Sequence, residues 1–149
     1  MKFIQNTSDI LLALGVAGKH RSPIKDFCID SRKAKKNSIF IGLTGSNEDG
    51  SKYCDDAFSN GAVFAIIKAK KGMNANKLKD NTLSVSNPEK ALAQLAQVAL
   101  KNFTGPVIGI TGSNGKTTTK NILSTGIKNS FSTFKNFNNE IGLPLCALM

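Results

Sequence analysis

The residues of this chain whose types and spacing point most directly to chemistry lie in one short segment. In order they are Gly112, Ser113, Asn114, Gly115, Lys116, Thr117 and Thr118. Glycines let a backbone approach an anion closely, and a helix that begins there adds partial positive charge. The lysine would reach the outer phosphates of a nucleotide, and the first threonine would offer its hydroxyl to Mg²⁺. We therefore predict an ATP-binding loop in which Lys116 is the catalytic residue and Thr117 is the metal ligand.

One position before this loop departs from the common phosphate-loop pattern G-x-x-x-x-G-K-[ST]. That pattern requires glycine where this chain has Ile110, and Gly109 and Gly112 flank the position instead. An ordinary tight turn between a strand and a helix, with a lysine there by chance, is the alternative interpretation. An apolar run at 107–111 before the loop and a helical pattern at 116–128 after it favour phosphate binding.

The elements that must position the loop alternate between strands and helices, which predicts an α/β fold. Apolar runs predict strands at 24–29, 39–43, 63–67, 83–85, 107–111 and 131–134. Helical spacing and capping residues predict helices at 8–14, 52–60, 88–99 and 116–128. The first of these helices would be capped by Thr7 or Ser8, and the third by Asn87. The basic, polar stretch 68–80 is predicted to be a loop.

A boundary near 84–87 divides these elements into two parts. We predict a small N-terminal α/β substrate domain at 1–86. It is followed at 87–149 by the start of a P-loop-type ATPase domain with a parallel sheet. After 86 the chain supplies one complete strand-and-helix unit, whereas a parallel sheet needs several.

Composition narrows the classes of partner. The 149 residues are 40% hydrophobic and carry a formal net charge of +10, which attracts polyanions. A nucleotide or nucleotide-sugar substrate and a merely solvated basic surface both fit. The basic residues are scattered and aromatic residues make up only 7%, which argues against a nucleic-acid binder. No apolar run approaches the roughly 20 residues of a membrane span, and the start does not resemble a secretion signal, so we expect a cytoplasmic protein.

The cysteines and the histidine give no sign of a metal centre or of a disulfide framework. Cys28, Cys54 and Cys146 are far apart and odd in number, so reduced, buried thiols are expected. His20 lies in a polar segment without an obvious partner, which favours a surface role.

Several segments resemble the Mur ligase family. The segment 110–120 is similar to the family's ATP loop, whose shortened form T-G-x-x-G-K-[ST] accounts for Ile110. Asp30-Ser31-Arg32, the segment 37–45 and Asp49-Gly50 resemble the family's N-terminal substrate domain. The segment 136–144, with its Asn-Asn-Glu-Ile-Gly, is most similar to the members that add D-alanyl-D-alanine. These matches occur in the family's order over nearly the whole chain.

The resemblance implies an ATP-dependent amide ligase of peptidoglycan precursor synthesis. The terminal carboxylate of a UDP-N-acetylmuramoyl-tripeptide would be phosphorylated by ATP with Mg²⁺, and the amine of D-alanyl-D-alanine would then attack the acyl phosphate. The family's substrate contacts fall on Ser31, Arg32, Ser46, Asn47, Asn138 and Asn139. The first four would hold the uridine nucleotide, and the last two would lie where the muramoyl-peptide approaches ATP. Residues 1–86 would then be the UDP-muramoyl-peptide-binding domain.

Simpler interpretations of these residues stay open. Asp30-Ser31-Arg32 also fits a turn closed by an Asx-type bond, and Asn138-Asn139 also fits a cap for the following segment. For the whole chain, the alternatives are the Mur ligase that adds the third peptide residue and a non-catalytic module that binds a UDP-sugar.

The resemblance also implies parts that this sequence lacks. A nucleotide-bound metal needs an acidic partner, and the only acidic residue after Lys116 is Glu140, which falls in a substrate loop. We therefore expect an N-terminal fragment that does not ligate alone, from an enzyme that is monomeric at full length.

Overall fold

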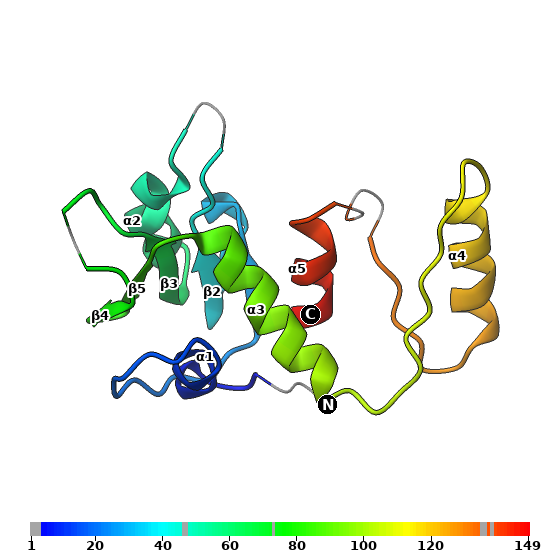
Figure 1. The fold of residues 1–149 in the computed structure, drawn as a ribbon, viewed down its shortest axis with the longest axis horizontal. Helices are drawn as coiled ribbons and strands as arrows, with labels where there is room; N and C mark the ends of the chain where they lie inside the picture. Colours follow the sequence, from blue (N-terminus) through cyan, green and yellow to red (C-terminus); the bar gives the residue numbers. More distant parts are fainter. Residues whose placement is uncertain (1–3, 46–47, 73, 135–136, 138) are drawn as a thin grey trace.

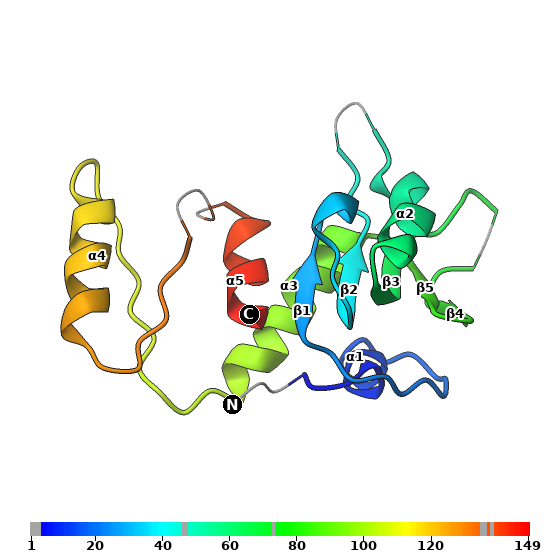
Figure 2. The ribbon, with the colours of Figure 1, turned by 180° about the vertical axis from the view of Figure 1, so that it is seen from behind.

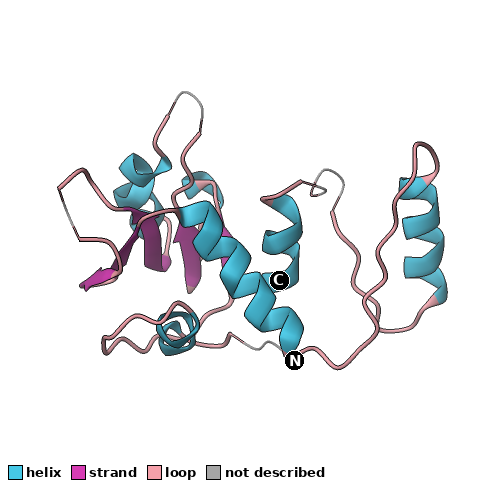
Figure 3. Ribbon diagram, in the orientation of Figure 1, coloured by secondary structure: helices cyan, strands magenta, loops and turns pink. Residues whose placement is uncertain are grey.

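The core of the structure is a five-stranded sheet with the strand order β1-β2-β3-β5-β4. The strands are β1 (Asp26–Cys28), β2 (Ser38–Ile41), β3 (Ala62–Lys68), β4 (Lys77–Lys79) and β5 (Thr82–Val85). β1, β2, β3 and β5 are parallel, and β4 runs antiparallel to β5. The computed structural model describes residues 4–45, 48–72, 74–134, 137 and 139–149. The predicted α/β class is confirmed (Figures 1 and 3).

Helices cover both faces of this sheet. The helices of the described structure are α1 (Thr7–Ala13), α2 (Cys54–Ser59), α3 (Pro88–Lys101), α4 (Lys116–Gly126) and α5 (Gly142–Leu148), with the 3-10 turns η1 (Ser31–Lys33) and η2 (Gly50–Tyr53). Of these helices, α4 lies apart from the sheet (Figure 1). α3 lies in front of the sheet in Figure 1 and behind it in Figure 2. Over the ranges that the structure describes, no helix combines the length and the apolar character that crossing a bilayer requires.

Side-chain alternation along the strands builds two cores. On β2, Ile39 and Ile41 enter the larger core together with α1, α3 and α5, while Phe40 enters a smaller core with Ala57 of α2. Successive side chains of a strand point to opposite faces, so a strand covered on both sides reads as a continuous apolar run. That is the pattern from which the sequence predicted β2 and β3.

α3 contributes most to the larger core, and it begins as the sequence predicts. Leu92 and Leu95 are fully buried (both 0% exposed), and Ala91, Ala96 and Ala99 lie on the same face. The Asn87 side chain accepts a hydrogen bond from the Lys90 amide (2.7 Å), and Pro88 occupies the first turn. The cap satisfies a helix amide that has no carbonyl partner of its own.

The cap of α1 is one residue earlier than predicted. Asn6, and not Thr7 or Ser8, accepts the hydrogen bond from the Ser8 amide (3.1 Å). Asp9 returns the interaction by accepting from the Asn6 amide (3.0 Å), which completes a capping box. Thr7 is instead fully buried and serves the packing of the helix.

Two predicted strands were wrong. Residues 107–111 and 131–134 form extended connections, and Val107, Ile108 and Phe131 are 69%, 55% and 60% exposed. A strand is stable only when its backbone pairs with a neighbour, and the described part of the chain places no strand beside either segment. α4 and its two connections instead form an arm beside the main body (Figures 1 and 2).

The sequence also missed β4 and α5. β4 lies inside the stretch predicted to be a loop, because three residues with lysines at both ends give almost no apolar signal. Only Leu78 of this strand packs against the larger core. α5 adds Leu145 and Leu148 to the same core, and it packs against α3 and β1.

His20 joins three parts of the fold, contrary to the predicted surface role. Its Nδ1 lies 2.7 Å from the Thr7 hydroxyl, and its Nε2 lies 2.9 Å from the Asn81 side-chain oxygen. The ring also packs against Phe64 of β3, with 5.1 Å between ring centroids. Since the Asn81 oxygen can only accept, Nε2 donates to it, and Nδ1 shares a hydrogen bond with the Thr7 hydroxyl. The imidazole is therefore structural.

The Cys28 thiol should resist alkylation in the folded protein. Burial is the main cause that raises its pKa from 9.0 to about 11, so its thiolate is about 100-fold scarcer at neutral pH than that of an ordinary cysteine. The unfolded thiol ionises first as the pH rises. The contribution of Cys28 to the free energy of unfolding is therefore fully present below pH 9 and is lost as the pH rises toward 11. We expect slow iodoacetamide labelling of Cys28 at pH 8, measured by peptide mass spectrometry. Equal rates with and without urea would contradict this.

Candidate functional site

The carboxyl ends of the parallel strands meet at one edge of the sheet, and the connections after them gather there. η1 follows β1, a hairpin at 42–50 follows β2, and α3 begins shortly after β5. Ligands of open parallel sheets bind outside this edge. The structure thus brings Ser31 and Arg32 to the same edge as the hairpin.

Asp30 organises the turn that carries Ser31 and Arg32. Its carboxylate accepts hydrogen bonds from the Arg32 amide (3.1 Å) and from the Arg32 guanidinium at Nε and Nη2 (both 2.9 Å). These bonds lower the pKa of Asp30. The Asx-type turn is therefore present. The Arg32 side chain is still 86% exposed, and its remaining N–H groups are available to a phosphate.

Ser31 occupies a more enclosed position than Arg32. The residue is buried, and its carbonyl oxygen accepts a hydrogen bond from the Asn60 side chain (3.1 Å), which ties η1 to the end of α2. No hydrogen bond to the Ser31 hydroxyl is found among the described residues, so the group is free to meet a ligand.

The stem of the hairpin is closed by two glycines. A Cβ on Gly50 would lie 2.5 Å from the Leu43 carbonyl oxygen, and one on Gly42 would lie 3.0 Å from the Gly50 carbonyl carbon. Only glycine allows two backbones to approach so closely. Gly50 donates to the Leu43 carbonyl (2.9 Å), and an isolated antiparallel bridge joins 44 to 49 above it. Ser46 and Asn47, which the sequence predicts as substrate contacts, lie outside the described residues.

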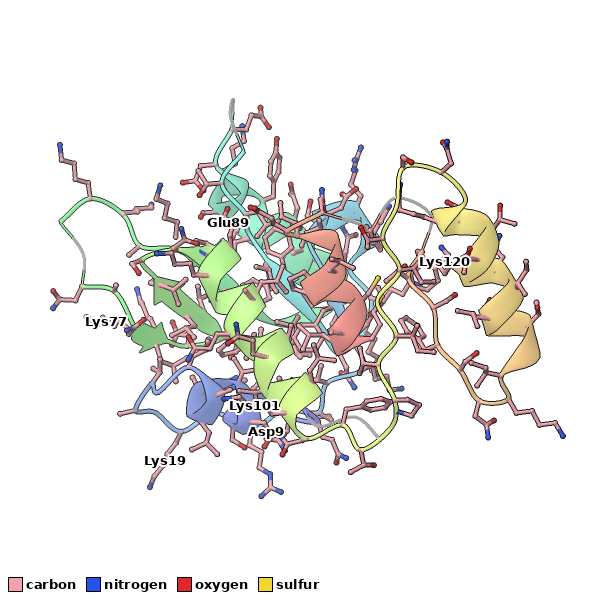
Figure 4. The ribbon with its side chains drawn as sticks, turned by 45° about the vertical axis from the view of Figure 1, so that its right-hand side comes forward. Asp9, Lys19, Lys77, Glu89, Lys101 and Lys120 are labelled. Atoms are coloured by element: carbon pink, nitrogen blue, oxygen red, sulfur yellow. The ribbon has the colours of Figure 1, made fainter. Side chains whose placement is uncertain are left out.

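Two carboxylates hold the flanks of this hairpin, and the sequence predicted neither. Glu89 of α3 accepts a hydrogen bond from the Thr44 amide (2.6 Å). On the other flank, Glu48 accepts from the Tyr53 hydroxyl (2.7 Å) and pairs with Lys52 (2.9 Å), and these bonds lower the pKa of Glu48. Figure 4 shows Glu89 at the beginning of α3. The sequence assigned Glu89 only to the positive end of the helix, because no pattern links it to a loop 45 positions away.

Asn139 lies before α5 and beside Glu89. Its side-chain oxygen accepts hydrogen bonds from the amides of Gly142 (2.7 Å) and Ile141 (3.3 Å), so Asn139 holds the turn that leads into α5, whose N-cap is Ile141. The same side chain lines a shallow, open hollow of about 310 Å³ together with Glu89, Glu140 and Ile141. Its amide nitrogen therefore stays available for a ligand. Asn138 lies outside the described residues.

The loop 112–118 connects to α4 on the arm, away from the strand edge (Figure 1). Gly112 and Gly115 have φ values of 143° and 78°, which glycine adopts without strain. The Lys116 ammonium folds back onto the Gly112 carbonyl oxygen and lies 3.4 Å from the Ser113 carbonyl oxygen. Residues 111–119 are exposed to solvent. The loop is therefore accessible to a ligand.

No group of three or more His, Cys, Asp or Glu side chains in the described ranges is arranged to hold an ion. The Thr117 hydroxyl is exposed, and among the described residues it has no hydrogen-bond partner. The described residues thus offer the Thr117 hydroxyl, but no cluster of metal-ligating side chains, at the predicted Mg²⁺ position.

Comparison with known sequences identifies relatives along nearly the whole chain. Residues 23–99 match the Mur ligase family, catalytic domain. The UDP-N-acetylmuramoyl-tripeptide–D-alanyl-D-alanine ligase of Buchnera aphidicola is 34% identical over 99% of this chain and 32% of its own length. The UDP-N-acetylmuramoyl-L-alanyl-D-glutamate–2,6-diaminopimelate ligase of Clostridium tetani is 41% identical over 64% of this chain and 20% of its own. The chain spans about a third or less of the length of these relatives.

The fold gives the same assignment. One similar structure is the crystal structure of the MurF ligase from Thermotoga maritima in complex with ADP, whose sequence is 38% identical. The superposition covers 83% of this chain and 29% of the Thermotoga chain, with a TM-score of 0.68. The fold of this chain thus recurs over most of its length in a protein of similar sequence. Since the family match covers half of the sequence as well, the chain belongs to the Mur ligase family.

Proposed function

We propose that this chain is part of an ATP-dependent ligase of peptidoglycan precursor synthesis that joins D-alanyl-D-alanine to a UDP-N-acetylmuramoyl-tripeptide. The observation that carries the proposal is the exposed loop 112–118 at the start of α4, in which Lys116 lies against loop carbonyl groups. The Buchnera relative, which carries this activity in its name, aligns over 99% of the chain and supports the choice of substrates.

ATP would bind at the first turn of α4. In this turn, the Thr119 amide donates a hydrogen bond to the Gly115 carbonyl oxygen (2.9 Å). The amides that precede Thr119 in the helix have no such partner among the described residues, so they are free to face a phosphate. Lys116 would leave the loop carbonyl groups and neutralise the outer phosphates, and Thr117 would ligate Mg²⁺. ATP supplies the phosphoryl group that activates the substrate carboxylate, and the amine later displaces it as phosphate.

The uridine nucleotide would bind at the carboxyl edge of the sheet. Arg32 would pair with a phosphate, and the Ser31 hydroxyl, together with Ser46 and Asn47, would hydrogen-bond the nucleoside. Asn139 would donate from its amide nitrogen to the muramoyl-peptide. We also propose the division into a substrate domain at 1–86 and an ATP-binding part at 87–149, and a full-length enzyme that acts as a cytoplasmic monomer.

Two other functions differ in the ligand that they prefer. A ligase for the third peptide residue would take the UDP-muramoyl-dipeptide, and the Clostridium relative, named as such a ligase, keeps this candidate open. A non-catalytic module for UDP-sugars would make no use of the peptide.

Calorimetric titration of the 149-residue chain separates these functions. We expect the UDP-N-acetylmuramoyl-tripeptide to bind at least about tenfold more tightly than UDP, because the peptide adds contacts near Asn139. Tighter binding of the dipeptide conjugate would favour the third-residue ligase, and equal binding of UDP would favour the module. Failure of all three ligands to bind would contradict the proposed substrate class.

A further inference from the structure

We infer that Glu89 is a positioning residue for the uridine-nucleotide side of the site, an inference that rests on the function proposed above. Its carboxylate touches neither Ser31 nor Arg32 in the described structure. It acts on the backbone of the hairpin 42–50 through the hydrogen bond from the Thr44 amide (2.6 Å). Glu89 thereby determines where this hairpin lies relative to the carboxyl edge of the sheet.

The carboxylate of Glu89 is supported by a rigid part of the fold. The residue lies in the first turn of α3, directly after the fully buried Pro88, and the Asn87 cap fixes the start of the helix (2.7 Å to the Lys90 amide). Leu92 and Leu95, one turn and more along the same helix, anchor it in the larger core. A charge-assisted hydrogen bond from such a support resists displacement more than a bond between two loops does.

The described stem of the hairpin, at 42–45 and 48–50, is held on both flanks once this bond is made. It is closed by the contact of Gly42 with Gly50, and its far flank is held by Glu48, which bonds Tyr53 and Lys52. Glu89 holds the flank that faces α3. A stem that is fixed before the ligand arrives loses little conformational entropy on binding, so the ligand binds more tightly.

The position of Glu89 also links the two sides of the substrate site. The same side chain lines the hollow that Asn139 and Glu140 share, so it lies between the hairpin and the segment before α5. A substrate that extends from the nucleotide edge toward Asn139 would pass beside this residue. Its loss would therefore change substrate affinity without removing a predicted contact.

Two variants of similar size separate the hydrogen bond from the bulk of the side chain. Glu89→Met keeps the length of the side chain and a good helix former but has no acceptor for the Thr44 amide, whereas Glu89→Gln keeps a carbonyl oxygen there. Lys90→Ala, at an exposed neighbouring position, serves as the control. The readouts are the exchange rate of the Thr44 amide by NMR, the calorimetric Kd for UDP-N-acetylmuramoyl-tripeptide, and the thermal midpoint.

We expect Glu89→Met to speed Thr44 exchange and to weaken substrate binding by about tenfold. Glu89→Gln should lose less, because it keeps a neutral acceptor, and Lys90→Ala should stay within about twofold of the parent. An unchanged Thr44 exchange rate or an unchanged Kd in Glu89→Met would overturn the inference. The inference would also be overturned if the loss of substrate affinity in Glu89→Met only followed a lowered thermal midpoint and Glu89→Gln showed the same loss. If the parent chain itself binds no substrate, the proposed function fails first and this inference fails with it.

Discussion

Replacing Lys116 by alanine is expected to weaken ATP binding by about 10- to 100-fold. The ammonium is the only cationic group that the loop 112–118 contains, and a hydrogen bond to a charged group contributes about 1.5–3 kcal/mol. In the free chain the same group bonds the Gly112 carbonyl oxygen, so the variant also loses a contact that closes the loop. Titration with ATP and Mg²⁺ by calorimetry measures the change.

A matched lysine on the same arm tests whether the effect is local. Lys128 is exposed just beyond the C-terminal end of α4, so Lys128→Ala changes the net charge equally but leaves the loop intact. We expect this control to bind ATP within about twofold of the parent at 0.15 M salt, where a distant charge is screened. Equal losses in both variants would mean that ATP is attracted only by the overall positive charge.

Gly61→Ala is expected to lower the free energy of unfolding by about 3 kcal/mol. Gly61 joins α2 to β3 with a φ of +107°, which alanine rarely adopts, and a Cβ there would lie 2.8 Å from the Lys36 amide nitrogen. The Asn37 amide also donates to the Gly61 carbonyl (3.1 Å), so the backbone cannot move away without losing a hydrogen bond. Conformational strain and the backbone clash therefore add together. Urea unfolding followed by circular dichroism measures the loss.

Gly72→Ala separates those two contributions. Gly72 has a similar φ of +86°, but no atom lies within 4 Å of the position that an alanine methyl group would take, so its replacement introduces conformational strain alone. We expect a cost of about 1 kcal/mol for this variant. If both glycine variants lose the same stability, the contact with Lys36 is not the cause of the larger effect.

The sequence predicted β2 and β3 well because these central strands are covered on both faces. Ile39 to Ile41 and Phe64 to Ile66 form apolar runs that mark such strands directly. The same argument failed at 107–111, where an equally apolar run has no partner strand in the described structure. An apolar run reports only that a segment is suited to burial, whereas pairing depends on which other strands lie beside it.

For the site, the sequence identified the residues that carry donors but not the residues that hold them in place. Arg32 and Lys116 stand out by type and by local spacing. Glu89 does not, because its partner Thr44, 45 positions away, becomes its neighbour only after the chain has folded. The same limit applies to His20, whose partners Thr7 and Asn81 are separated from it by 13 and 61 positions.

The lysines of β4 have a consequence for how the molecule behaves in concentrated solution. β4 ends the sheet on one side, and an unpaired strand edge can template pairing with another copy of the same chain. Lys77 and Lys79 are both exposed there (Figure 4 labels Lys77), and antiparallel pairing of two such edges would bring their ammonium groups close together. The three residues that gave no strand signal in the sequence thus protect the sheet against self-association.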